Sequence, residues 1–177
     1  DAVLGIGRLM RHELFLRWDD EGLLREIQGV IAVFAERGLL RRGERSGWLL
    51  APEAGSEEFP ELQLIGETLR PTLGRHFLAL ALLPQRGSGM LTRKVLAENC
   101  HLMAQRLALL HGASAAETAD KSVFAGLVAN LVDSDLLRED GEGLLHFDEH
   151  LLGPLTYSEL VLPVEARQAI RRVAVSQ

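Results

Sequence analysis

A mainly helical fold with two small β-hairpins is predicted by the sequence, and three observations lead to it. Leucine, a strong helix former, supplies 35 of the 177 residues. Aromatic residues, on which β-rich domains rely together with β-branched residues, make up only 5%. Apolar residues recur three and four positions apart along most of the chain, which is the spacing of amphipathic helices. With 47% hydrophobic and 25% charged residues, the composition excludes intrinsic disorder, collagen and coiled coils.

The first 50 residues predict two helices followed by a hairpin. Leucines separated by charged residues over residues 3–16 fit an amphipathic helix. A second helix begins after Asp19 or Asp20, because a carboxylate there accepts hydrogen bonds from free backbone N–H groups, and it ends near Gly38. Its apolar residues are Leu23, Leu24, Ile27, Val30, Ile31 and Phe34. Residues 39–50 then have the pattern of a strand, a glycine-bearing turn and a second strand.

The middle of the chain predicts a linker and three helices. Proline and glycine over residues 51–60 are typical of a linker, and a helical pattern resumes over residues 61–83. Pro71 is expected to begin a second helix within this stretch, because proline fits the first turn of a helix but not its interior. Thr92 is expected to cap a further helix that Gly112 closes.

A second helix and hairpin repeat the arrangement of the first. Asp120 can cap a helix that is followed, over residues 136–147, by a strand, a glycine-bearing turn and another strand. Leu136-Leu137 therefore occupies the same place as Leu39-Leu40 does after the earlier helix. Residues 148–177 have the pattern of one or two short helices, broken by glycine and proline.

Each helix with its hairpin resembles the recognition helix and wing of winged-helix domains. We therefore expect two winged-helix-like units, one within about residues 1–55 and one, with the C-terminal helices, within residues 56–177. Residues 66–111 carry a net charge of +4, whereas residues 114–160 carry −8. An acidic second wing would repel a phosphate backbone, and the whole chain carries −6, so the sequence argues against a nucleic-acid partner.

Two patterns with histidine or cysteine resemble sites of chemistry but lack the required context. His146-Phe147-Asp148-Glu149-His150 has the H-x-x-E-H spacing of one class of zinc peptidases. Zinc requires both imidazoles on one helical face and a third ligand, whereas His146 lies in the pattern of a strand. Cys100 and His101 are adjacent, so on a helix their side chains point about 100° apart and do not form a catalytic pair. Cys100 is interpreted as a small core thiol, and a lone cysteine excludes an internal disulfide framework.

The first hairpin is basic. Arg41, Arg42 and Arg45 could contact nucleic acid or anionic lipid, or they could form a solvated tip that Glu44 balances. Trp18, at the junction before the second helix, is expected to be a core anchor.

The remaining patterns identify no site. Gly5-Ile6-Gly7 lacks the third glycine and the preceding strand of a dinucleotide fingerprint, and Gly87-Ser88-Gly89 is expected to be a loop. The longest clean apolar run is far shorter than the roughly 20 residues that cross a membrane. We predict no catalytic, substrate-binding or metal-binding residue in this chain, and no cofactor.

Several stretches, in order over about residues 8–140, resemble the C-terminal region of bacterial membrane-associated glycerol-3-phosphate 1-O-acyltransferases. The resemblance is carried by His12-Glu13-Leu14-Phe15-Leu16-Arg17-Trp18-Asp19, Arg37-Gly38-Leu39-Leu40, Leu91-Thr92-Arg93, Met103-Ala104-Gln105-Arg106-Leu107, Leu109-Leu110-His111-Gly112 and Asp120-Lys121-Ser122-Val123-Phe124. It implies an enzyme that transfers a fatty acyl group from acyl-CoA or acyl-carrier protein to the 1-hydroxyl of glycerol 3-phosphate. The product is lysophosphatidate, and the implied place is the cytoplasmic face of the bacterial inner membrane.

The catalytic motif that the resemblance implies is missing from this chain. Catalysis in the family rests on His-x4-Asp, in which the histidine is the general base and the aspartate orients its ring. None of the six histidines has an aspartate five positions later. Pro52-Glu53-Ala54 and Pro60-Glu61-Leu62 also lack the glycine of the family's Pro-Glu-Gly phosphate motif. We therefore expect residues 1–177 to be the C-terminal, non-catalytic domain of a larger enzyme, and a first residue other than Met fits this expectation.

The implied role of such a domain is to support or dock on the upstream catalytic domain of the same protein. The parent enzyme would use acyl-CoA or acyl-carrier protein and glycerol 3-phosphate, and would associate with the membrane. Two alternatives remain open from the sequence: a regulatory module that binds protein or lipid, and a winged-helix nucleic-acid binder.

Overall fold

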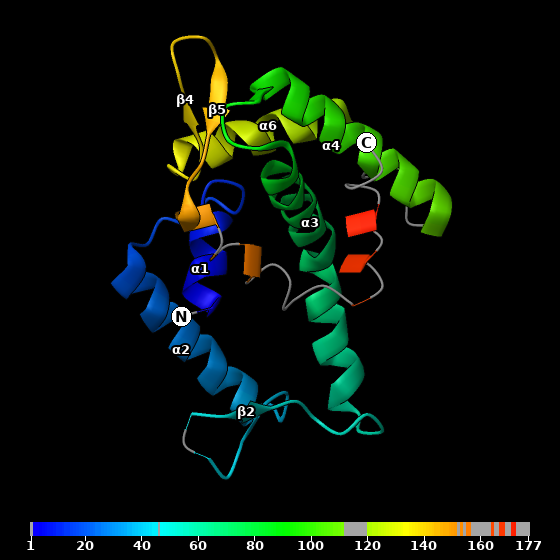
Figure 1. Cartoon of the computed structure of the whole chain (residues 1–177). Helices are drawn as coiled ribbons and strands as arrows, with labels where there is room; N and C mark the ends of the chain where they lie inside the picture. Colours follow the sequence, from blue (N-terminus) through cyan, green and yellow to red (C-terminus); the bar gives the residue numbers. More distant parts are fainter. Residues whose placement is uncertain are drawn as a thin grey trace. The chain divides into compact units, whose positions relative to one another are not determined.

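The computed structural model of the chain is mainly helical with two small antiparallel sheets, which confirms the predicted fold class (Figure 1). It describes residues 2–45, 47–111 and 120–151, and single positions or pairs at 153, 155–156, 164, 167–168 and 171–172. The helices are α1 (Ala2–Leu9), α2 (Asp20–Glu36), α3 (Glu58–Arg86), α4 (Arg93–His111) and α6 (Lys121–Asp133). The strands are β1 (Arg41–Arg42), β2 (Leu49–Leu50), β3 (Leu91–Thr92), β4 (Arg138–Glu139) and β5 (Leu144–His146), and a 3-10 turn spans Glu149–Leu151.

The chain divides into two compact units, which fall differently along the sequence from the ranges 1–55 and 56–177. One is Arg17–Arg70, and the other joins Asp1–Leu16 to Pro71–Gln177. The N-terminal segment belongs with the C-terminal part because Leu9 lies in the same hydrophobic cluster as the second half of α3. The division between the units falls within α3 itself.

The unit Arg17–Arg70 contains the first helix and hairpin, as predicted. Asp19 is the N-cap of α2, because its Oδ1 accepts a hydrogen bond from the Gly22 N–H at 2.8 Å, whereas Asp20 is the first helical residue. The helix is followed by Gly38 at a φ of +74°, a backbone conformation that favours glycine. The strands β1 and β2 then pair antiparallel, with Arg41 opposite Leu50.

Helix α3 corrects the prediction that Pro71 begins a new helix. Helical structure runs without a break from Glu58 to Arg86, with Pro71 and Pro84 inside it. A proline removes one backbone hydrogen bond from a helix, but it does not remove the burial that holds the rest. The second half of α3 is fully buried over nearly every residue from His76 to Leu83, which offsets that loss. The predicted linker is also shorter, because the helix already begins at Glu58.

The second unit has the element order of a winged-helix domain. Helix α3 is followed by β3, the helices α4 and α6, and the strands β4 and β5, with the sheet order β3-β5-β4. The wing strands β4 and β5 were predicted, but β3 was not, because Leu91 and Thr92 gain strand structure only by pairing with Leu145 and Leu144. Thr92 is also the predicted cap, since its Oγ1 accepts from the Val95 N–H at 3.3 Å.

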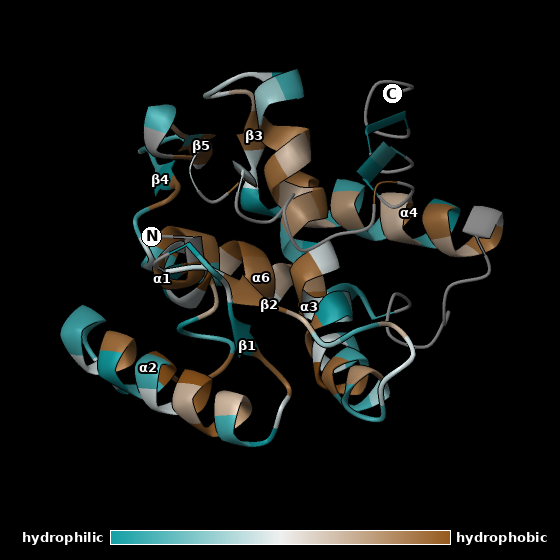
Figure 2. Ribbon diagram, turned by 90° about the horizontal axis from the view of Figure 1, so that it is seen from below, coloured by the Kyte–Doolittle hydropathy of each residue, from teal (hydrophilic) through white to brown (hydrophobic). Residues whose placement is uncertain are grey.

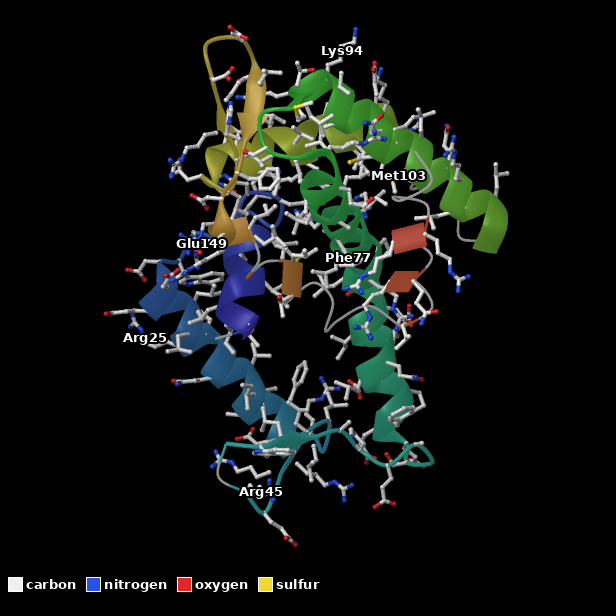
Figure 3. All side chains as sticks on the ribbon, viewed as in Figure 1. Arg25, Arg45, Phe77, Lys94, Met103 and Glu149 are labelled. Atoms are coloured by element: carbon white, nitrogen blue, oxygen red, sulfur yellow. The ribbon has the colours of Figure 1, made fainter. Side chains whose placement is uncertain are left out.

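The hydrophobic core of this unit lies among α3, α4 and α6. Figure 3 marks Phe77 of α3 and Met103 of α4, both fully buried. Helix α6 is capped by Asp120, as predicted, with Oδ1 accepting from the Ser122 N–H at 2.8 Å. The predicted end at Gly112 lies outside the described residues. Figure 2 shows the apolar stretches of these helices, and no described helix is long and apolar enough to cross a membrane.

Candidate functional site

The H-x-x-E-H pattern does not lie on a single helix. His146 is the last residue of β5, while Glu149 and His150 belong to the 3-10 turn that follows. The Nε2 atom of His146 lies 2.7 Å from Oδ2 of Asp140, at the opposite end of the wing turn. Among the described residues, no three histidine, cysteine or carboxylate side chains are grouped so that they could hold a metal ion. His146 is therefore part of the structure of the wing.

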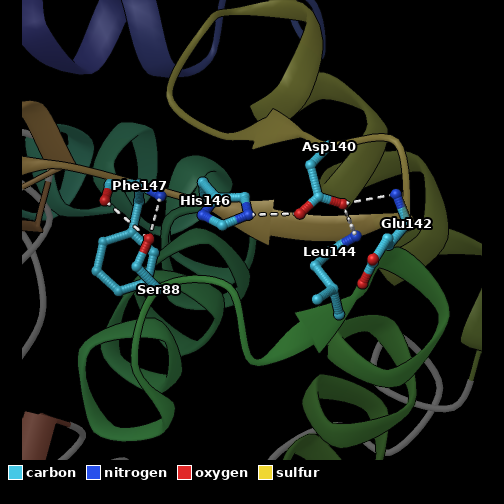
Figure 4. A network of polar contacts seen from close by, with 6 residues as sticks. All are labelled: Ser88, Asp140, Glu142, Leu144, His146 and Phe147. Carbon is cyan, nitrogen blue, oxygen red and sulfur yellow. Dashed lines mark hydrogen bonds and ion pairs between the residues drawn. The ribbon is translucent and has the colours of Figure 1, made fainter.

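Asp140 organises the turn of this wing (Figure 4). Besides contacting His146, it accepts hydrogen bonds from the backbone N–H groups of Glu142 and Leu144, both at 2.9 Å. These bonds, that from His146 first, hold the pKa of Asp140 below its usual value. Because the carboxylate satisfies three donors, the turn has a defined conformation although its side chains are exposed.

The loop between α3 and β3 is fixed to the same wing (Figure 4). The hydroxyl of Ser88 donates to the Phe147 carbonyl at 3.1 Å and accepts from the Phe147 N–H at 2.9 Å. Gly89 has a φ of +75°, and a Cβ atom there would lie 2.7 Å from Cε1 of His146. The Gly87-Ser88-Gly89 segment is thus a loop, as predicted, and its glycines allow the close approach of the wing.

The second wing and its helix offer few cations to a phosphate backbone. The described residues 138–149 carry Arg138 against five acidic residues, namely Glu139, Asp140, Glu142, Asp148 and Glu149. At the start of α6, the ammonium group of Lys121 lies 2.7 Å from Oε1 of Glu98. Nucleic-acid binding requires a basic patch on the helix or wing, and this surface is acidic.

Cys100 and His101 have separate environments. Cys100 is fully buried, and burial raises the pKa of its thiol to about 12, so the thiol stays protonated at neutral pH. The Nε2 atom of His101 lies 3.0 Å from the side-chain nitrogen of Gln105, and its ring contacts Phe124 edge-on at 6.2 Å between centroids. The two side chains do not form a nucleophile and base, in agreement with the interpretation of Cys100 as a core thiol.

A half-buried polar cluster was missed in the sequence. Glu13 lies 3.0 Å from a guanidinium nitrogen of Arg75 and 3.4 Å from Nε2 of His76, which is fully buried. The Nδ1 atom of His76 is 2.9 Å from the Thr72 carbonyl, and burial is the main cause that lowers the pKa of His76. The cluster joins the turn after α1 to the second half of α3. The available signal was an Arg-His pair directly before the longest apolar run.

The first hairpin is basic and apolar at once. The guanidinium group of Arg45 lies over the ring of Trp48 at 5.7 Å, and Trp48 is 58% exposed. Arg41 is 3.5 Å from Glu53, and Leu49 and Leu50 of β2 are also exposed. Trp18, expected to be a core anchor, is half-buried, with Arg17 over its ring at 5.2 Å.

The unit Arg17–Arg70 leaves half of its large apolar side chains exposed. Among its described residues, the buried large apolar side chains are Leu23 and Leu39. The exposed ones are Leu24, Val30, Val33, Trp48, Leu49, Leu50, Leu64, Ile65 and Leu69. Large exposed apolar surfaces mark places where another molecule or segment binds, so this unit is the candidate interaction surface of the chain.

Comparisons with known proteins give the family. Residues 1–140 match the family model described as the glycerol-3-phosphate acyltransferase C-terminal region. The chain is 38% identical over 168 residues to the glycerol-3-phosphate acyltransferase of Pseudomonas savastanoi pv. phaseolicola, covering 94% of this chain and 20% of that protein. It is 38% identical over 170 residues to the glycerol-3-phosphate acyltransferase of Pseudomonas aeruginosa, and this match covers 95% of this chain and 20% of that protein. The chain thus spans about a fifth of the length of these relatives, and no solved structure matches it. The chain belongs to the glycerol-3-phosphate acyltransferase C-terminal region family.

Proposed function

We propose that the chain is the C-terminal, non-catalytic portion of a glycerol-3-phosphate acyltransferase. This enzyme transfers a fatty acyl group from acyl-CoA or acyl-carrier protein to the sn-1 hydroxyl of glycerol 3-phosphate, giving lysophosphatidate. The observation that carries the proposal is the match of residues 1–140 to a family defined by the C-terminal region. No histidine of this chain precedes an aspartate in the His-x4-Asp spacing, so the general base would belong to the upstream part of the parent protein.

The role of this portion is to dock on the upstream catalytic domain and support its geometry at the cytoplasmic face of the membrane. Two features favour a supporting role. The second wing is held in a defined conformation by Asp140, Ser88 and Gly89, and the polar cluster around Glu13 fixes the N-terminal turn to α3. The uncovered apolar side chains of the unit Arg17–Arg70 provide surface for a partner domain.

A truncation of the parent protein tests this role. The parent with and without these 177 residues is brought to equal concentration, and the formation of lysophosphatidate from glycerol 3-phosphate is measured together with the melting temperature. We expect the truncated protein to lose activity, thermal stability or both, and the separately added chain to restore part of the loss. A parent in which the catalytic histidine is replaced defines zero activity. Full activity and unchanged melting of the truncated protein would contradict the proposal.

A lipid-binding role is the second candidate, and the first hairpin is the observation that favours it. Arginine beside an exposed Trp48, with exposed Leu49 and Leu50, is the composition of segments that lie in a membrane interface. Sedimentation with vesicles rich in anionic lipid tests it, comparing the wild-type chain with a variant in which Arg41, Arg42 and Arg45 are serine. A variant with serine at Arg25, Arg70 and Arg106 has the same charge change outside the hairpin and is the matched control. Binding lost only in the hairpin variant would favour the lipid role, and absence of wild-type binding would exclude it.

A further inference from the structure

We propose that the apolar stripe of α2 is the surface that the upstream part of the parent protein covers. The stripe consists of Leu24, Ile27, Val30, Ile31 and Phe34, which the spacing of three and four places along one side of the helix. This inference rests on the proposed function, because it assigns a surface to the docking that the proposed function requires.

None of the five side chains of the stripe is buried in the described structure. Val30, near its centre, is 50% exposed, Leu24 is 42% exposed, and the other three side chains are only half-buried. Figure 2 shows apolar segments repeating along this helix. An amphipathic helix of a globular protein ordinarily buries such a stripe, so the stripe of α2 lacks a cover.

Helix α6 shows what covers the equivalent residues in the second unit. Counted back from the first strand of each hairpin, Ile27, Val30, Ile31 and Phe34 of α2 correspond to Phe124, Leu127, Val128 and Leu131 of α6. These four residues are the buried residues of α6, which packs against α4 and belongs to the core cluster. The same positions of the same motif are therefore core residues in one unit, whereas in the other Val30 is exposed and the remaining three are only half-buried.

The unit Arg17–Arg70 also has too small a core to stand without a cover. Its buried large apolar side chains are Leu23 and Leu39, whereas the cluster of the second unit contains 21 buried residues among those that the structure describes. Domains of about 55–65 residues are marginal even with a complete core, because they bury only about 60% of their unfolded surface. Covering the α2 stripe supplies the missing apolar burial.

The share of the relatives that this chain spans and the net charge of the unit Arg17–Arg70 indicate what covers the stripe. The chain spans about a fifth of its relatives, so roughly four fifths of a parent of that length lies outside it. Residues 17–70 contain seven arginines and eleven aspartates and glutamates, which gives a net charge of −4. Away from the basic hairpin, this negative charge disfavours an anionic membrane as the cover of the stripe, whereas an apolar groove with a basic rim on a protein domain fits both the stripe and the charge. The occupant is therefore the upstream domain.

Amide hydrogen exchange in the parent protein tests the assignment, with Val30→Asp as the disrupting variant. Val30→Asp places a charge at the centre of the stripe, and Ala32→Asp places the same charge on the exposed opposite side of the same helix, as the matched control. We expect the amides of residues 24–34 to exchange at least tenfold more slowly in the parent than in the 177-residue chain alone. Val30→Asp should abolish this difference, whereas Ala32→Asp should retain it. Leu24→Ala and Val30→Ala together, which introduce no charge, should reduce it in the same way if Val30→Asp prevents folding.

The outcomes separate this inference from the proposed function. Slowed exchange elsewhere in the chain, with α2 unchanged, would leave the docking role in place and overturn the assignment of its surface. Equal protection of α2 in the chain alone would also overturn it, because the chain would then cover its own stripe. Protection that appears in the chain alone only at high concentration, together with a doubled mass in light scattering, would show that a second copy is the occupant. A truncated parent of full activity and stability would instead contradict the proposed function.

Discussion

Replacing Phe15 with glycine should stabilise this protein, although it removes an aromatic side chain. Phe15 has a φ of +51°, in the left-handed region that bulky residues rarely adopt. The Leu16 N–H donates to the Arg11 carbonyl at 2.9 Å and the Phe15 N–H to the His12 carbonyl at 3.4 Å, which is the hydrogen bonding of a Schellman motif. Glycine is the usual residue at the left-handed position of that motif, and Phe15 occupies it here with 90% of its surface exposed.

The magnitude follows from two opposing terms. A left-handed conformation costs an L-residue about 1–2 kcal/mol, which Phe15→Gly removes. Glycine has more conformational freedom in the unfolded chain, which reduces this gain in stability by about 0.5–1 kcal/mol. The exposed ring contributes little burial, so the net expectation is an increase of about 0.5–1 kcal/mol in the free energy of unfolding.

Urea unfolding followed by circular dichroism measures this change, provided that the slope of the transition is the same for both proteins. Phe15→Ala is the control, because alanine removes the ring but keeps the left-handed cost, and its stability should differ little from that of the wild type. A Phe15→Gly protein that is less stable than the wild type would refute the reasoning, since it would mean that the ring packs against the protein.

Three further changes test the polar contacts of the second unit. Glu13→Ala should lower the free energy of unfolding by about 1–3 kcal/mol, because Arg75 is only 15% exposed and loses its carboxylate partner. Glu13→Gln should lower the free energy of unfolding by less, and urea unfolding of the two variants measures the difference. Gly89→Ala should lower the free energy of unfolding by about 1–3 kcal/mol, because the residue has a positive φ and an added Cβ atom would clash with His146. In a double-mutant cycle, His146→Ala should restore the share of the loss that the clash causes. Asp140 has a lowered pKa in the folded state, so its contribution is present above the unfolded pKa near 3.8 and is lost as pH falls through the folded value. The stability difference between wild type and Asp140→Asn in urea should therefore shrink below about pH 4; a difference unchanged between pH 7 and pH 3 would contradict the role of this carboxylate.

Local sequence signals were sufficient to predict most of the helices and hairpins of the fold. Helix α2 was predicted from the spacing of its apolar residues and from the carboxylate before it, and the structure shows Asp19 as its cap. Both hairpins were predicted from glycine-bearing turns between short apolar pairs, and both pair antiparallel. These elements depend on residues close together in the sequence, which is why a single sequence is enough to predict them.

The features that were predicted wrongly or missed are those that depend on residues far apart in the sequence. Pro71 is a local signal for a helix start, but the burial of the second half of α3 in the core keeps the helix continuous. Strand β3 exists only because Leu91 pairs with Leu145, which lies far along the chain. The cluster of Glu13, Arg75 and His76 also joins separate segments, and no spacing rule connects them. Tertiary contacts therefore overrode the local signal at Pro71 and created both the strand β3 and the polar cluster.

The two helix-plus-hairpin units show why fold alone was a poor guide to function here. A winged-helix arrangement suggests nucleic-acid binding, yet the wing formed by β4 and β5 is acidic, and α6 directs its apolar residues into a core. The first unit repeats the motif, but the corresponding residues of α2 are half-buried or, at Val30, exposed. If both units only supported the fold, selection for solubility would disfavour the exposed stripe, because exposed apolar surface promotes aggregation. The cost is offset only if a partner covers the stripe in the assembled protein, and this is why we propose the docking surface where the repeated motif lacks its core.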